Sequence, residues 1–195
     1  MPKPISTVVL LSGSGRTLEN LLEKVNSDNL PIDIMAVVSS RPNVRGIDIA
    51  ENANIDSKVF QRNYFESISE HNLAINSWIY PYSPKLILLA GYICFYQLPS
   101  WFNGIALNIH PALLPKYGGK GYYGDKVHQA VLENNEPTTG CTVHHVTDQY
   151  DSGAIVAQSE VAVFAEDDID TLAARVFDAE CDLYPEAIKK VVSQL

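Results

Sequence analysis

The succession of strand, glycine loop and helix at the start of the chain is the feature that most constrains its fold. Thr7–Leu11 is an unbroken β-rich, apolar run, which is typical of a parallel strand buried on both faces. The loop Ser12–Thr17 ends this run, and Leu18, Leu21 and Val25 then recur at helical spacing. A strand that enters a helix through a glycine loop is typical of α/β sheets, which bind ligands at the carboxyl ends of their strands.

Strands and helices continue to alternate along the chain. Further strands are predicted at Ile32–Val38, Lys58–Phe60, Leu86–Ala90, Ile105–Ile109, Thr138–Val146 and Ala154–Val163. Helices are predicted around Ile47 and Ala50, over Tyr64–Tyr82, over Lys126–Glu133, and from Asp168 to the end of the chain. This alternation predicts βαβ units and an α/β fold with a doubly wound, mostly parallel sheet.

Composition narrows the function classes. The net charge of −9 argues against a nucleic-acid binder, which needs a basic face, although backbone N–H groups can still hold an anionic substrate. The cysteines Cys94, Cys141 and Cys181 are odd in number and lack a C-x-x-C pair, so we expect neither a disulfide framework nor a zinc site. The longest apolar stretch, Leu86–Leu98, is too short for a membrane span. We therefore expect a cytoplasmic protein that acts on small molecules, without nucleic-acid or membrane partners.

The glycine loop is a candidate phosphate site. Its candidate residues are Gly13, Ser14, Gly15, Arg16 and Thr17. Backbone N–H groups and the positive end of the helix dipole favour an anion there, and a guanidinium and a hydroxyl add donors. The simpler alternative is a tight turn with a helix cap. The dinucleotide pattern G-x-G-x-x-G is not completed, which disfavours a dinucleotide-dependent oxidoreductase.

Two polar side chains close the predicted strand at Asn108-Ile109-His110-Pro111. Strand alternation points Asn108 and His110 to one side, and an amide beside an imidazole suits a developing oxyanion. Polar capping of a strand end is the alternative. The later loop Thr147–Gly153 contains Asp148 and Asp151, a pattern that also fits turn chemistry or, less well, a calcium loop.

The other histidines are predicted to have no role in metal binding or chemistry. His144 and His145 are adjacent on a strand and face opposite ways, which predicts strand residues and not a metal pair. His71 and His128 are expected to be exposed to solvent.

Three segments together resemble one known family. Ser12–Thr17, Asn108–Tyr117 and Thr147–Gly153 occur in the order typical of phosphoribosylglycinamide formyltransferases, which belong to the folate-dependent formyltransferases. The resemblance extends from about Val8 to about Pro185. It implies a Rossmann-like formyltransferase fold with a C-terminal helix, and transfer of the formyl group of 10-formyltetrahydrofolate, as co-substrate, to the amine of glycinamide ribonucleotide in purine biosynthesis. No metal is expected.

The resemblance also implies an organisation and residue roles. We expect one domain over residues 1–195, with a phosphate-binding half at about 1–107 and a catalytic and folate-binding half at about 108–195, in a monomer or homodimer. Asn108 and His110 would stabilise a tetrahedral intermediate, and Asp151 would assist proton transfer. The glycine loop would hold the substrate phosphate and Glu180 the substrate amine. The folate pocket would comprise Leu89, Tyr92, Ile93, Cys94, Val146, Thr147 and Asp148.

The chain departs from the family pattern at a few positions. Arg16 stands where a small hydroxyl residue is common in the family, Cys94 where the family often has arginine, and Phe177 where a polar substrate contact is often found. The loop Gly118–Gly124 is longer than in many members. These departures concern substrate and folate contacts and leave the three candidate catalytic residues intact. The alternatives are a formyltransferase acting on an amino sugar nucleotide, and a non-catalytic folate-binding module.

Overall fold

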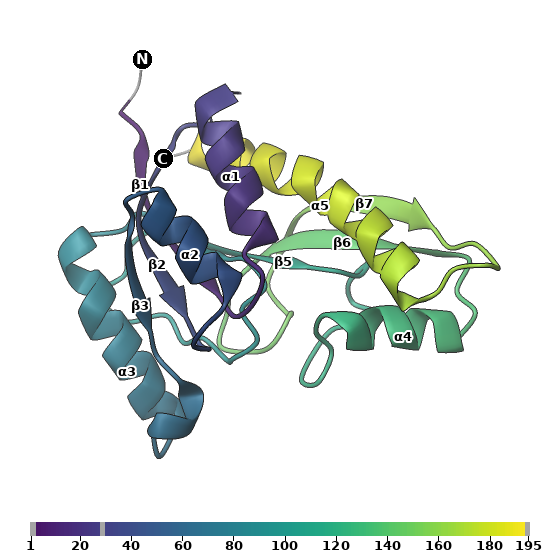
Figure 1. Ribbon diagram of the computed structural model, residues 1–195, viewed down its shortest axis with the longest axis horizontal. Helices are drawn as coiled ribbons and strands as arrows, with labels where there is room; N and C mark the ends of the chain where they lie inside the picture. Colours follow the sequence, from purple (N-terminus) through teal and green to yellow (C-terminus); the bar gives the residue numbers. More distant parts are fainter. Residues whose placement is uncertain (1–2, 28–29, 194–195) are drawn as a thin grey trace. The chain divides into compact units, whose positions relative to one another are not determined.

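The computed structural model describes residues 3–27 and 30–193 of the 195-residue chain (Figure 1). The strands are β1 (Ile5–Leu11), β2 (Ile32–Ser39), β3 (Asp56–Val59), β4 (Leu86–Leu89), β5 (Ile105–His110), β6 (Thr138–His145) and β7 (Ile155–Ala162). The α-helices are α1 (Arg16–Ser27), α2 (Arg45–Asn52), α3 (Ile68–Ile79), α4 (Asp125–Glu133) and α5 (Ile169–Val192). Within the described residues, the strands form one seven-stranded sheet in the order β3-β2-β1-β4-β5-β6-β7.

Strand directions confirm the predicted fold class. Strand β1 pairs in parallel with β2 and with β4, and β2 pairs in parallel with β3. Strands β6 and β7 form an antiparallel pair. The sheet is therefore mostly parallel, and the chain has the predicted doubly wound α/β architecture with a C-terminal helix.

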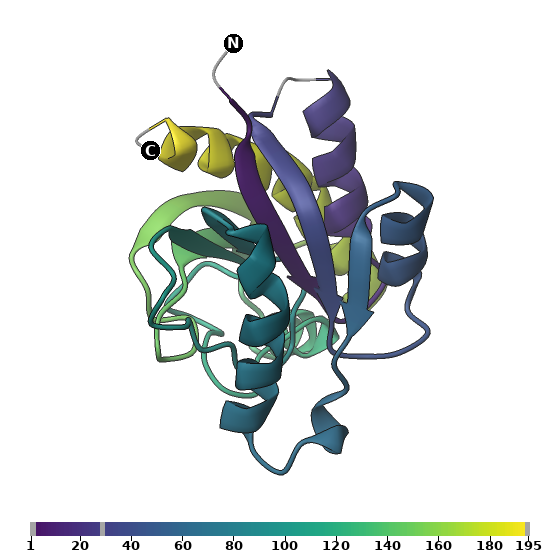
Figure 2. The same ribbon diagram turned by 90° about the vertical axis from the view of Figure 1, so that its left-hand side faces the viewer.

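The chain divides into two compact units, of which the first comprises residues 1–107 and 191–195. Helices α1 and α2 cover one face of its strands and α3 covers the other, as Figures 1 and 2 show. Right-handed crossovers require this arrangement, because the chain moves outward from β1 to β3 and then returns to β4 on the other side of β1. Residues Val8–Leu11 of β1 are fully buried, as a strand covered on both faces must be.

The second unit comprises residues 108–190. Its core lies between the β6–β7 hairpin and the helices α4 and α5. The buried members are Val131 from α4, Cys141 from β6, Val161 from β7, and Leu172 and Val176 from α5. Leu172 and Val176, which recur at helical spacing, thus lie on the face of α5 that packs against this hairpin, as the sequence pattern predicts.

Element boundaries differ most from the prediction around β3 and α3. The segment Tyr64–Tyr82, predicted as one helix, begins at the last residue of the 3-10 helix η1 (Arg62–Tyr64), contains α3 and ends with the 3-10 helix η2 (Tyr80–Tyr82). Helix α3 begins after Ser67, whose hydroxyl accepts a hydrogen bond from the Glu70 N–H at 3.0 Å. This N-cap ends the helix on that side. Strand β3 begins two residues before the predicted Lys58.

The expectation that His71 and His128 are exposed is wrong. His71 is fully buried on the same face of α3 as Ile75 and Ile79, and its Nε2 lies 2.9 Å from the Phe60 carbonyl oxygen. His128 is buried on α4. Burial lowers the pKa of both histidines, so both act as neutral core residues near pH 7.

None of the helices in the described part of the chain is long and apolar enough to cross a membrane.

Candidate active site

Four polar side chains of the second unit meet at the end of β5. Asn108 Nδ2 lies 3.0 Å from His144 Nε2 and 3.4 Å from Asp151 Oδ1. Asp151 Oδ1 lies 3.4 Å from His144 Nε2, and Asp151 Oδ2 lies 3.7 Å from His110 Nδ1. The structure thus brings together the three candidate catalytic residues and adds His144 to them.

A hydrogen bond to the main chain fixes which nitrogen of His110 can titrate. His110 Nε2 lies 2.7 Å from the carbonyl oxygen of Tyr117, which can only accept, so Nε2 carries a hydrogen. Nδ1 is then the atom that gains or loses a proton, and it is the atom that faces Asp151. Burial lowers the pKa of His110 and outweighs the opposite effects of Asp151 and the Tyr117 carbonyl. Near neutral pH the ring is therefore mainly neutral, with an open lone pair on Nδ1.

Asp151 is held as a carboxylate. Burial acts to raise its pKa, but the neighbouring His144 imidazole, the charge of His110 and the N–H of Gly119 together lower that pKa below its usual range. The Gly119 N–H donates to Oδ2 at 2.9 Å. The backbone of Asp151 has a φ of 49°, in the left-handed region that aspartate tolerates better than most residues.

The loop that carries Asp151 is fixed at both ends. The Thr147 hydroxyl accepts from the Gln149 N–H at 3.3 Å and lies 3.0 Å from the Ser152 hydroxyl. At the far end, a Cβ on Gly153 would lie 1.7 Å from the carbonyl oxygen of His145, so only glycine fits there. The glycine of the Asp-x-Gly pattern is therefore required by the close approach of this loop to β6.

His144 lies on a strand, as predicted, but its contact with the polar cluster was not predicted. Its side chain is buried, and Nδ1 lies 2.9 Å from the carbonyl oxygen of His145. Nδ1 therefore carries the hydrogen, and Nε2 accepts from Asn108. Alternation indicated that His144 and His145 face opposite ways but not which of them faces Asn108. The nearness of His144 to the loop Thr147–Gly153 was the only indication that the sequence offered.

The glycine loop lies in the first unit, between β1 and α1. Gly15 has a φ of 71°, and a Cβ there would lie 2.4 Å from the Cα of Gly46. Glycine at position 15 thus lets the loop approach the start of α2 closely. The Arg45 guanidinium is 3.5 Å from the Ser14 carbonyl oxygen and forms an ion pair with Glu19. Helix α1 begins at Arg16, so the loop ends at a helix N-terminus, as predicted.

The remaining candidate residues are distributed over both units. Leu89 ends β4, and Tyr92, Ile93 and Cys94 follow it in the first unit, where the Ile93 N–H donates to the Ser12 hydroxyl at 3.0 Å. Val146, Thr147, Asp148 and the half-buried Glu180 on α5 lie in the second unit. No group of three or more His, Cys, Asp or Glu side chains within residues 3–27 and 30–193 is arranged to hold a metal ion.

Comparison with known proteins identifies the family. A family model described as "Formyl transferase" matches residues 5–188. The phosphoribosylglycinamide formyltransferase of Haemophilus influenzae is 37% identical over 183 residues, which are 93% of this chain and 84% of that protein. The chain belongs to the phosphoribosylglycinamide formyltransferase family. It is thus a formyltransferase, as the resemblance in its motifs implied.

Solved structures of the family share the fold. The phosphoribosylglycinamide formyltransferase from Brucella melitensis is 38% identical, with a TM-score of 0.83 over 97% of this chain and 96% of that one. The glycinamide ribonucleotide transformylase 1 from Symbiobacterium toebii is 32% identical, with a TM-score of 0.86 over 95% of this chain and 86% of that one. These likenesses extend over nearly the whole chain, so they include the elements that carry both the glycine loop and the polar cluster.

Proposed function

We propose that the protein transfers the formyl group of 10-formyltetrahydrofolate to the amine of glycinamide ribonucleotide, a step of purine biosynthesis. The observation that carries this proposal is the cluster of Asn108, His110 and Asp151 in a member of this formyltransferase family. The names of its relatives support the acceptor, since the proteins from Haemophilus influenzae and Brucella melitensis are both called phosphoribosylglycinamide formyltransferases.

The proposed chemistry begins with attack of the acceptor amine on the formyl carbon. The formyl oxygen gains negative charge as the tetrahedral intermediate forms, and donors placed near it lower the barrier. Asn108 Nδ2 can supply one donor, because its 3.4 Å contact with Asp151 is long and its hydrogen can turn to a stronger acceptor. His110 can supply a second only through Nδ1, since Nε2 is bonded to Tyr117.

Donation from His110 therefore requires a proton on Nδ1. Burial disfavours the resulting imidazolium, whereas the Asp151 carboxylate, 3.7 Å away, favours it. The negative charge that develops on the formyl oxygen adds a second favourable neighbour. We expect the proton released by the attacking amine to reach Nδ1, with the help of Asp151, and to pass to the departing folate nitrogen when the intermediate collapses.

The proposed binding roles follow from the resemblance to the family. We propose that Gly13–Thr17 hold the substrate phosphate, because their loop ends at the N-terminus of α1. Glu180 would hold the substrate amine. The residues proposed for folate binding are Leu89, Tyr92, Ile93, Cys94, Val146, Thr147 and Asp148. We further propose a cytoplasmic monomer or homodimer that works on small molecules, as one functional domain.

The decisive experiment is turnover of 10-formyltetrahydrofolate by the purified protein with glycinamide ribonucleotide and then without it. We expect tetrahydrofolate release that depends on the ribonucleotide, together with formation of its formylated amine. If amino sugar nucleotides and not the ribonucleotide support turnover, the acceptor is wrong but formyl transfer stands. If the protein binds folate and turns over with neither acceptor, it is a binding module, and the proposed function fails.

A further inference from the structure

A four-residue turn after β5 contacts both members of the His110–Asp151 pair. This turn, Lys116–Gly119, presents the Tyr117 carbonyl oxygen to His110 Nε2 at 2.7 Å and the Gly119 N–H to Asp151 Oδ2 at 2.9 Å. The ring of His110 and the carboxylate of Asp151 are thus both oriented by the main chain of one turn. The 3.7 Å distance between Nδ1 and Oδ2 depends on the conformation of that turn.

Tyr117 holds a backbone conformation that its own side chain disfavours. Its φ is 55°, in the left-handed region that bulky residues rarely occupy, so other contacts must stabilise it. Its hydroxyl donates to Glu136 Oε1 at 2.9 Å. Its ring meets the ring of Tyr122 edge-on, with the centroids 6.0 Å apart, and packs against the core of the second unit. The hydroxyl bond is the directional contact among these.

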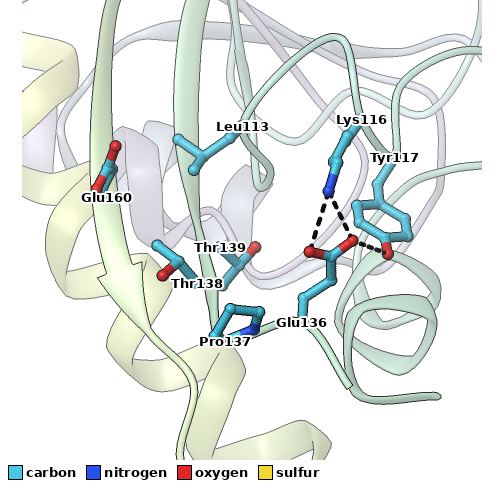
Figure 3. A pocket seen from close by; sticks show the side chains of 8 residues that line it. All are labelled: Leu113, Lys116, Tyr117, Glu136, Pro137, Thr138, Thr139 and Glu160. Atoms are coloured by element: carbon cyan, nitrogen blue, oxygen red, sulfur yellow. Dashed lines mark hydrogen bonds and ion pairs between the residues drawn. The ribbon is translucent and has the colours of Figure 1, made fainter. Parts of the chain in front are cut away.

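Glu136 is a fixed anchor for that bond. It lies just beyond the end of α4, where its N–H donates to the Val131 carbonyl at 3.2 Å. The Lys116 ammonium donates to both carboxylate oxygens, at 2.9 and 3.1 Å. Figure 3 shows the side chains of Lys116 and Tyr117 both directed at this carboxylate, at one side of a pocket of about 330 Å³.

The bond to Glu136 persists over a wide pH range. Hydrogen bonds from Lys116 and Tyr117 lower the pKa of Glu136, so it stays a carboxylate. Burial and the neighbouring carboxylate raise the pKa of Tyr117 to about 12, so its phenol keeps its proton. The donor and the acceptor therefore remain matched throughout the pH range in which an enzyme is assayed.

We propose that Glu136 is a positioning residue for His110, acting through the side chain of Tyr117. Its carboxylate keeps Tyr117 in the left-handed conformation that places the Tyr117 carbonyl against His110 Nε2. Without this anchor the Tyr117 peptide relaxes, and Nε2–H loses its acceptor. The ring of His110 is then no longer restricted to the tautomer that leaves Nδ1 open toward Asp151. The inference rests on the proposed role of His110 in formyl transfer, but its first test does not need turnover.

That test is an NMR titration of the imidazole nitrogens in the ¹⁵N-histidine-labelled protein, with His110 assigned from a His110→Asn variant. In the native protein we expect a protonated Nε2 and an unprotonated Nδ1 above the titration midpoint. In Tyr117→Phe and in Glu136→Ala we expect a mixture of tautomers. We also expect a midpoint lower by about half a unit to one unit, because the carbonyl bond to the imidazolium is stronger than the bond to the neutral ring.

Two further variants separate positioning from charge and from packing. Glu136→Gln keeps an oxygen that accepts from the Tyr117 hydroxyl, so His110 should keep its native tautomer in this variant, unlike in Glu136→Ala. Glu160→Gln removes a carboxylate that lines the same pocket from β7 but makes no hydrogen bond or ion pair with the other residues drawn in Figure 3. It should leave the His110 spectrum unchanged. Tyr117→Phe preserves ring packing, so it remains informative if Glu136→Ala does not fold.

Kinetics supply the second readout. Misplacement of a reacting group can cost up to about 100-fold, so we expect kcat to fall by about that factor at most in Tyr117→Phe, with a smaller change in KM. Folded Tyr117→Phe and Glu136→Ala proteins with native His110 shifts and midpoint would overturn the inference. If the native protein lacks turnover with glycinamide ribonucleotide, the proposed function fails while the NMR result still decides the positioning role.

Discussion

Replacing Asp151 by asparagine should remove most of the activity and keep the fold. Asparagine has the same shape, tolerates the left-handed backbone of this position, and still accepts from the Gly119 N–H. What it removes is a negative charge 3.7 Å from His110 Nδ1, at a carboxylate that is only 11% exposed. At an effective dielectric constant of about 20, this interaction is on the order of 4 kcal/mol. If the imidazolium forms in the transition state, losing that interaction slows kcat by about 1000-fold.

The assay is steady-state release of tetrahydrofolate at saturating substrate, with a urea unfolding curve to verify that the variant is folded. Asp178→Asn, an exposed carboxylate on α5, is the matched control and should stay within about twofold of the native rate. The Asp151 charge also acts to raise the pKa of His110, so the midpoint of His110 should fall further in the variant. A folded Asp151→Asn protein with a kcat within about tenfold of the native value would refute this reasoning.

Three further perturbations follow from the same contacts. His144→Phe removes the acceptor that Nε2 provides to the half-buried Asn108 amide, which costs about 1–3 kcal/mol, so a kcat lowered about 10- to 100-fold is expected in the same assay. Gly153→Ala forces a Cβ against the carbonyl of β6, and urea unfolding should show a loss of about 1–3 kcal/mol. The pKa of Asp167 is lowered to about 2 by its bidentate ion pair with a guanidinium on α5. Its stabilisation is therefore present above pH 3.8 and is lost as the pH falls to about 2, and Asp167→Asn should flatten the acid limb of a thermal-denaturation profile in that window.

Periodicity predicted the elements of this fold because most of their hydrophobic residues face a core. The apolar run Thr7–Leu11 is buried on both faces, and Leu172 and Val176 lie on one face of α5. Periodicity failed for polar residues that share such a face. His71 occurs at helical spacing with Ile75 and is fully buried, because the Phe60 carbonyl supplies a hydrogen-bond partner that the sequence does not reveal. Whether a polar residue on an apolar face is buried thus depends on its hydrogen-bond partner, and tertiary structure determines that partner.

The polar cluster illustrates the same limit at the level of chemistry. Asn108 and His110 could be predicted because two polar residues at strand spacing close an apolar run. His144 could not, since its role depends on which side of β6 faces Asn108. The positioning roles of Tyr117 and Glu136 could not be predicted from any pattern, because these residues act through a carbonyl oxygen and through a backbone angle of 55°. Polar residues that close a strand leave a pattern in the sequence, whereas residues that act through the main chain leave few.

A physical reason connects the two left-handed residues of the site, Tyr117 and Asp151. In the proposed mechanism, His110 requires an acceptor at Nε2 and an open Nδ1, and Asp151 requires a carboxylate that faces the ring. A regular strand or helix uses most of its carbonyls and N–H groups internally, so few of them are free for such side chains. The turn Lys116–Gly119 provides a carbonyl and an N–H because its backbone leaves the regular conformations. The unfavourable backbone angles are therefore a requirement of the site, and side-chain anchors such as Glu136 hold them in place.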